Sequence, residues 1–359
     1  MPPPIDLTQN PKYALEGRIV TMNDDRTVIG EGIVYIEGDS IVAVLPKSEN
    51  APAGFTKSEA IKVGGTIYPG MIELHNHLCY NVLPQWIVPK LYTNRNQWRN
   101  HKDYSPRIST PVRVLGSTER YGSALVKFVE CKCLMSGTTT SQGITLQSNQ
   151  GIKKYFKGVV RNVEAPILKS LKPADTKIQD VEAAKLASFR KKLKKSSCLL
   201  LHLSEGVDAK ARSYFTTLRD AGTGEWAITD ALAGIHANGL NSSDLAILKN
   251  HGGSVVWSPL SNFMLYGQSL DIKTAKNLDL LLALGSDWSP TGSKNLLCEL
   301  KVAKIASDSL GGVFSDEELV AMTSLNPAKI LKWDQKIGSI EKGKLADLLV
   351  VKGQQGDPY

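Results

Sequence analysis

The central part of the chain repeats one pattern, in which a short apolar segment is followed by a polar loop and often by a stretch with helical spacing. Such alternation is typical of parallel β/α units. Clear helical stretches run over 180–193 and 242–249. Seven apolar segments are predicted as strands: 66–74, 138–140, 158–163, 199–202, 234–236, 254–257 and 280–284.

The number of these segments favours a TIM-like (β/α)8 barrel, which needs one more strand between 163 and 199. A doubly wound sheet fits less well, because no glycine fingerprint follows the first strand and polar residues recur where strands end. The predicted fold class is therefore α/β, with a barrel of this kind at its centre.

Both ends of the chain have a different character. Segments 17–22, 32–37 and 40–44 are short, rich in β-branched residues and separated by turn residues, and 345–351 is another apolar strand. We expect strands from both ends to pair in one small β-sandwich domain. The predicted domains are 1–67 and 332–359 as the two parts of the sandwich, the second apparently shortened, with a metal-dependent barrel over 68–331.

Composition excludes several classes of protein. Hydrophobic residues make up 42% and charged residues 22% of the chain, a globular balance, and no apolar run reaches the roughly 18 residues of a membrane span. No secretory signal is readable at the start, so the predicted location is the cytoplasm. The net charge of +8 includes a basic run at 190–195, but no aromatic residues are interleaved there, so no nucleic-acid partner is expected. The five cysteines form no Cys-x-x-Cys pair, which argues for reduced thiols.

Histidines end several of the predicted strands. His75 and His77 are two positions apart after an apolar strand, so both imidazoles face the same side and can reach one metal ion. His202 and His236 each end a later strand, and Asp287 comes just after another. Taken singly, each has an ordinary structural explanation, such as a hydrogen-bonded core histidine or a turn-forming aspartate. Together they indicate a metal site at the carboxyl-terminal rim of the barrel.

Glu205 adds a possible proton carrier. It follows His202 by three residues, and we expect it in the loop just past the strand, where a carboxylate can face a metal-activated water. The remaining histidines lie in other contexts: His251 is predicted to be structural, and His101 is a candidate substrate contact. Trp86 and Asn262 are further candidate substrate contacts.

Seven motifs occur in the order typical of one enzyme family. They are 69–77 with its His-Asn-His, the His-Leu-Ser-Glu of 202–205, His236, the Ser-Pro-Leu-Ser-Asn of 258–262, the Gly-Ser-Asp of 285–287, 326–329 and 338–347. This set resembles the amidohydrolase superfamily, in particular its branch of atrazine/triazine hydrolases and cytosine/guanine deaminases, and spans about 15–351.

The resemblance implies roles for individual residues. It makes His75, His77, His202 and Asp287 ligands of one divalent metal ion, zinc or iron. It makes Glu205 the proton shuttle and gives His236 the task of polarising the attacked centre or holding the water, while Asp287 also accepts a proton. The implied reaction is hydrolytic deamination of an amino-substituted nitrogen heterocycle, a small-molecule substrate.

Two other functions are open at this stage. One is a binuclear cyclic-amide hydrolase of the hydantoinase kind, which would need a carbamylated lysine; Lys169 is the one lysine near a plausible fourth strand. The other is a non-catalytic scaffold, which we would expect to have lost metal ligands. The substrate itself is not specified by the sequence, although Trp86, Tyr92, Trp98 and Tyr104 could stack on a planar ring. A homo-oligomer is compatible with the sequence.

Overall fold

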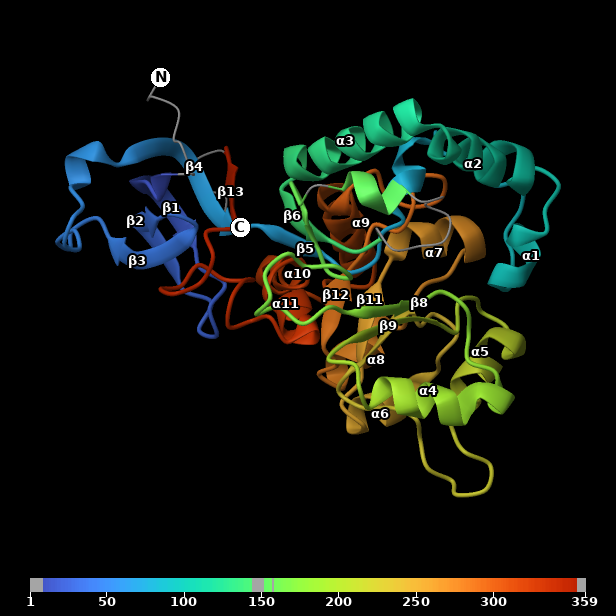
Figure 1. The fold of residues 1–359 in the computed structure, drawn as a ribbon. Helices are drawn as coiled ribbons and strands as arrows, with labels where there is room; N and C mark the ends of the chain where they lie inside the picture. Colours follow the sequence, from blue (N-terminus) through green and yellow to red (C-terminus); the bar gives the residue numbers. More distant parts are fainter. Residues whose placement is uncertain (1–8, 144–151, 157, 354–359) are drawn as a thin grey trace.

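Eight short parallel strands form the wall of the central α/β unit in the computed structural model, which describes residues 9–143, 152–156 and 158–353 (Figure 1). One sheet has the order β5-β6-β7, and the other has the order β12-β11-β10-β9-β8. Their bounds are β5 Met71–Glu73, β6 Thr138–Ser141, β7 Arg161–Asn162, β8 Asp175–Lys177, β9 Leu199–Leu203, β10 Leu232–His236, β11 Ser254–Trp257 and β12 Leu282–Leu284.

Within the described residues the two sheets are joined by a β-bridge along one edge. A parallel bridge between Asn76 and Asp287 joins the chain just after β5 to the chain just after β12. Within the described residues no ladder connects β7 to β8, so the predicted barrel is an α/β fold of the TIM type that is not closed. The reason is physical: β7 and β8 are two and three residues long and polar, so they offer few backbone pairs and little apolar surface.

The additional strand that the barrel pattern requires between 163 and 199 is β8, whose sequence Asp-Thr-Lys carries no apolar signal. The predicted strand 66–74 is instead two strands in different sheets, β4 (Ile61–Pro69) and β5, separated at Gly70. Gly70 is needed there because a Cβ atom would lie 2.4 Å from Thr139 Oγ1. The chain thus leaves one sheet and enters the other within a single residue.

A second body of the molecule consists of strands from both ends of the chain. Its sheet order is β13-β4-β1-β2-β3, with β1 Lys12–Val20, β2 Val28–Glu37, β3 Ser40–Pro46 and β13 Leu348–Val351. The antiparallel pairing of β13 with β4 confirms that strands from both ends combine. The described strands form this one five-stranded sheet, so the predicted two-layered sandwich is not confirmed, and the domain boundaries at 67 and 331 stay predictions.

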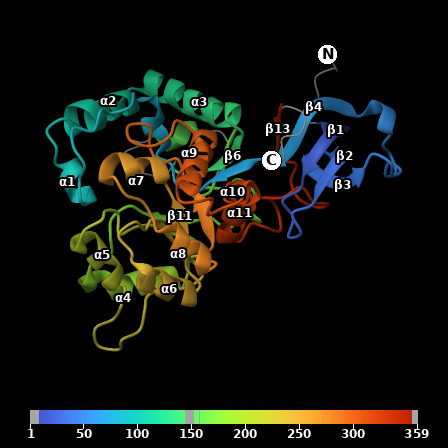
Figure 2. The same ribbon diagram turned by 180° about the vertical axis from the view of Figure 1, so that it is seen from behind.

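Helices surround the barrel strands, as the two opposite views show (Figures 1 and 2). The predicted helical stretches 180–193 and 242–249 are found as α4 Leu186–Leu193, preceded by a short 3-10 turn, and as α6 Ser242–Asn250. No helix of the described residues is long and apolar enough to span a bilayer. The other helices are α1 Arg95–Arg99, α2 Thr110–Ser117, α3 Glu119–Met135, α5 Ala209–Thr216, α7 Pro259–Tyr266, α8 Ile272–Asn277, α9 Leu296–Ser309, α10 Asp316–Ala321 and α11 Leu325–Leu331.

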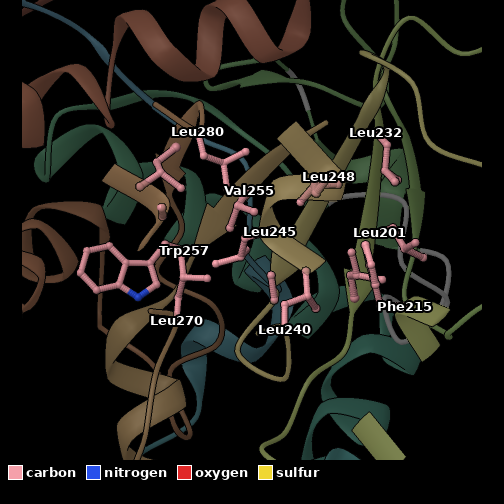
Figure 3. Close-up of a cluster of buried hydrophobic side chains, with 14 of the residues drawn as sticks. Leu201, Phe215, Leu232, Leu240, Leu245, Leu248, Val255, Trp257, Leu270 and Leu280 are labelled. Atoms are coloured by element: carbon pink, nitrogen blue, oxygen red, sulfur yellow. The ribbon is translucent and has the colours of Figure 1, made fainter. Parts of the chain in front are cut away.

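The largest hydrophobic cluster lies between β9–β12 and the helices outside them (Figure 3). Leucines of the strands pack there against leucines and aromatic rings of the helices, and most of these side chains are completely buried. Such close packing fixes where each strand ends, and hence where the residues just after it lie. The labelled members are Leu201, Phe215, Leu232, Leu240, Leu245, Leu248, Val255, Trp257, Leu270 and Leu280.

Candidate active site

Three histidines and an aspartate converge beyond the carboxyl ends of β5, β9 and β12. His75 Nε2 lies 3.2 Å from His202 Nε2 and 3.4 Å from Asp287 Oδ1. His77 Nε2 lies 3.3 Å from the same oxygen. In two overlapping groups, His75/His77/His202 and His75/His236/Asp287, all the ligand atoms lie within 4.8 Å of one another. The residues predicted as metal ligands are therefore brought together.

The backbone at this point is held in unusual conformations. His236 and Asp287 have positive φ angles of 68° and 59°, which side chains other than glycine rarely adopt. The amide of Asp287 donates to the carbonyl of His75 over 3.0 Å, and a Cβ atom on Gly285 would lie 2.4 Å from His75 Cβ. Strain of this kind is retained where surrounding structure imposes it, often at functional sites. It aims the Asp287 side chain at the histidines.

Residues at the start of α7 and just before it orient two of the imidazole rings from behind. His75 Nδ1 lies 2.7 Å from Ser258 Oγ. His236 Nδ1 donates to Asn262 Oδ1 over 2.9 Å, because a carboxamide oxygen only accepts. In both rings Nδ1 is occupied by this partner, and Nε2 faces the other side chains of the cluster. Histidines that bind metal ions are commonly oriented by such a hydrogen bond at the second ring nitrogen. Asn262, predicted as a substrate contact, thus contacts His236 and does not line the cavity.

Glu205 is buried beside this cluster, in the loop past β9 as predicted. Tyr266 donates its hydroxyl to Glu205 Oε1 over 2.7 Å, while Arg95 Nε and His236 Nε2 lie 3.4 Å and 3.8 Å from Oε2. Burial by itself would raise the pKa of Glu205, but His236, Arg95 and the Tyr266 hydroxyl outweigh it, and the pKa is lowered. Glu205 is therefore a carboxylate near neutral pH, able to take up a proton.

The protonation states suit a metal ion. Burial lowers the pKa of His75 and His202 well below the ordinary value and that of His77 to about 3, so these imidazoles are neutral with lone pairs available. Burial and the charge of Glu205 raise the pKa of Asp287 well above the ordinary value. A cation beside this carboxylate would reverse that shift. Neutral imidazoles with one carboxylate are donors that zinc and related divalent ions accept, so the residues fit such an ion.

A cavity of about 480 Å³ opens onto this cluster. Its aromatic wall contains Trp98 and Tyr104, two of the rings singled out in the sequence, together with Tyr80 and Trp288. The complete lining is His77, Tyr80, Arg95, Trp98, Arg99, Tyr104, Thr176, Lys177, Ile178, Gln179, His202, Glu205, His236, Asp287 and Trp288.

Two predicted substrate contacts lie elsewhere. Trp86 is 3% exposed and packs against His101, with ring centroids 5.9 Å apart, and neither residue lines the cavity. The sequence interpretation missed Trp288, although it directly follows Asp287, and it missed Arg95 and Arg99. The spacing of these two arginines around Trp98 on one helix is a signal that could have indicated a shared face.

Comparison with known proteins agrees with this geometry. Residues 228–359 match the amidohydrolase family. A 5-methylthioadenosine/S-adenosylhomocysteine deaminase of Teredinibacter turnerae is 21% identical over 362 residues, covering 89% of this chain and 78% of the relative. The enzyme of the same name from Clostridium tetani is 22% identical over 380 residues, covering 93% and 83%.

Solved structures share the fold. The triazine hydrolase of Arthrobacter aurescens has a TM-score of 0.71 at 16% identity and covers 97% of this chain and 89% of its own. Guanine deaminase from C. acetobutylicum has a TM-score of 0.68 at 16% identity, covering 95% and 91%. An adenosine deaminase from Xanthomonas campestris, with bound zinc, has a TM-score of 0.64 at 17% identity, covering 95% and 84%. The carboxyl-terminal part of the chain thus matches the amidohydrolase family, and the chain as a whole is similar to hydrolytic deaminases that act on carbon–nitrogen bonds.

Proposed function

We propose that the chain deaminates an amino-substituted nitrogen heterocycle, releasing ammonia by hydrolysis of a carbon–nitrogen bond. One observation carries the proposal: Glu205 and His236 line the same cavity as the cluster of metal-donor side chains. The cavity can hold a planar ring against an aromatic wall while both groups reach the reacting end. The relatives named as deaminases support the same reaction class.

In this proposal His75, His77, His202 and Asp287 hold one divalent ion, zinc or iron. When bound, such an ion supplies Lewis acidity that makes water a nucleophile near neutral pH. The imidazoles are neutral and Asp287 lies beside them, which is the protonation and placement that such an ion would require.

The side chains of the cavity then move protons. His236 carries its proton on Nδ1, toward Asn262, so its Nε2 is an acceptor that can hold and orient the attacking water. Asp287 accepts a proton from that water. Glu205, kept ionised by Arg95 and Tyr266, takes up the other proton of the water and transfers it to the ring nitrogen next to the attacked carbon. The proton held by Asp287 then passes to the amino group, which leaves as ammonia.

The binuclear alternative has less support. Lys169, the candidate for carbamylation, is exposed, and the metal-donor groups of the described residues contain histidine and aspartate only. A scaffold without activity would not need the complete donor set or the charge arrangement around Glu205.

Metal analysis tests the ligand assignment and the stoichiometry. We expect one equivalent of zinc or iron per chain, lost in His75→Ala and in His202→Ala, because the remaining donors are too few for tight binding. His251→Ala is the matched control, since His251 caps α6 through Ile247 on the surface and should keep the metal. Two equivalents in active protein would favour the binuclear reaction, and full metal content in both variants would refute the ligand set.

Activity is tested by screening ammonia release over purines, pyrimidines, pterins and triazines with the metal-loaded protein. Turnover of at least one amino heterocycle is expected. Hydrolysis of cyclic amides without any ammonia release would contradict deamination.

A further inference from the structure

Two basic side chains at the rim of the cavity have no part in the proposed proton transfers. Arg99 is exposed at the end of α1, and Lys177 is half-buried at the end of β8, and both line the cavity. In the described part of the chain, neither side chain makes a hydrogen bond or an ion pair with another side chain. Both therefore offer N–H donors at the rim that no described side chain takes up.

The acids that line the cavity are engaged with other groups. Glu205 pairs with Arg95, and Asp287 belongs to the metal-donor set, so no acid of the lining remains for Arg99. Asp180 does not line the cavity; it acts electrostatically on both Lys177 and Arg95 and is shared between them. A divalent ion held by the proposed ligands would add further positive charge at the bottom of the cavity. The rim is thus electropositive.

The aromatic wall runs between the metal-donor cluster and this rim. Trp288 contacts His77 at one end, with ring centroids 6.2 Å apart. It also packs on Trp98 at 5.4 Å and on Tyr104 at 6.1 Å. Trp98 and Arg99 are consecutive on α1, so the wall leads from the reacting end to the cation. A ring stacked on the wall would point its far substituent at the rim.

Building on the proposed function, we propose that the substrate carries an anionic group, a carboxylate or a phosphate, on the side of the ring away from the amino group, and that Arg99 and Lys177 bind it. Charge-assisted hydrogen bonds to a guanidinium and an ammonium would fix the length and orientation of the molecule. The same cations would give the enzyme a preference for anionic over neutral heterocycles of equal ring size.

Binding of compounds that lack the amino group tests this subsite without any turnover. We would compare inosine with inosine 5′-monophosphate, and lumazine with lumazine-6-carboxylate, by calorimetry on the metal-loaded wild-type protein. The anionic member of at least one pair should bind about tenfold more tightly, and the preference should shrink at high salt. The first pair reports a phosphate and the second a carboxylate.

Charge-removing variants connect the preference to the two residues. In Arg99→Gln/Lys177→Gln the ratio of anionic to neutral affinity should fall by about tenfold. The control Arg113→Gln/Lys191→Gln removes the same charge from exposed positions outside the cavity and should keep the ratio.

Equal affinities within both pairs, absence of binding by all four compounds, or an unchanged ratio in the Arg99/Lys177 variant would each overturn the subsite. Failure of the proposed deamination would be seen separately, as binding of these ligands by a protein that releases no ammonia from adenosine 5′-monophosphate, pterin-6-carboxylate or the corresponding neutral compounds.

Discussion

The two sheets of the barrel are held together in different ways. The strands β9–β12 are apolar and pack against the large cluster of leucines and aromatic rings. The strands β5–β7 are short and largely polar, and buried side-chain hydrogen bonds stabilise them. Glu73 accepts from the Ser286 amide over 2.9 Å and from Asn76 Nδ2 over 2.7 Å, and Arg161 pairs with Asp347. The half with β9–β12 is stabilised by close packing of apolar side chains. The half with β5–β7 is stabilised by hydrogen bonds and an ion pair between polar side chains.

The two halves should therefore differ in how well they tolerate substitutions. An apolar core accepts substitutions of similar size, whereas a buried polar network loses stability when one partner goes. The side chains proposed to bind the metal ion come from both halves, so the proposed site depends on the apolar packing and on the polar network together.

The largest effect on activity is expected for substitution of Glu205. This residue lies where the two halves meet: its carbonyl accepts a hydrogen bond from the amide of Arg95, in the segment between β5 and β6. Glu205→Gln keeps size and a hydrogen-bonding carbonyl but cannot carry the proton, so kcat should fall by about 10² to 10⁴ with metal content retained. Steady-state kinetics and metal analysis measure this, with exposed Glu182→Gln as control. Near-wild-type turnover, or loss of the metal, would refute the shuttle role.

Among the stability effects, shortening a buried side chain in the apolar half should be the largest. Leu201 is completely buried on β9, so Leu201→Ala should lower the free energy of unfolding by about 2–5 kcal/mol. Leu297→Ala, at a position that is half exposed, should cost far less. Urea titration monitored by circular dichroism compares the two variants. Equal losses would mean that this core does not dominate the stability of the apolar half.

A buried acid in α9 should make stability depend on pH. Burial raises the pKa of Glu299 to about 7, although it accepts from Ser293 and from the Leu260 amide. Between about pH 4.5 and 7 the unfolded chain releases this proton and the folded chain keeps it, so this contribution to stability falls as pH rises and then levels off. The fall amounts to at most about 3 kcal/mol. Glu299→Gln should flatten the profile measured by denaturant unfolding, and an unchanged slope would contradict the assignment.

The smallest of these effects is expected in the polar half. Glu73→Gln places an amide NH₂ group among the donors Ser286 and Asn76, so one buried contact is lost at a cost of about 1–3 kcal/mol. Because Ser286 precedes Asp287, metal affinity should fall as well. Unfolding and metal titrations measure both quantities, with exposed Glu119→Gln as control. Unchanged values in both would show that the polar network does not hold the site.

The same division explains what could be predicted from the sequence. Strands β9–β12 and their terminal His202, His236 and Asp287 follow from apolar runs that end in polar residues. Strand β8 has no apolar residue, and the break at Gly70 depends on contact with Thr139, a residue far along the chain. Neither feature leaves a periodic signal. The cavity wall is likewise formed by residues from loops and from α1, whose positions depend on tertiary packing.

Because of the bridge between Asn76 and Asp287, the proposed metal ion would also affect stability. The first and last strands of the barrel meet at this seam, and Glu73 and Ser286, which bond across it, are 213 residues apart in the sequence. A metal ion held by His75, His77 and Asp287 would cross-link the two edges, closing a very long loop as a disulfide does. The proposed ion would thus also stabilise the contact between the ends of β5 and β12, and a chelator would weaken that contact.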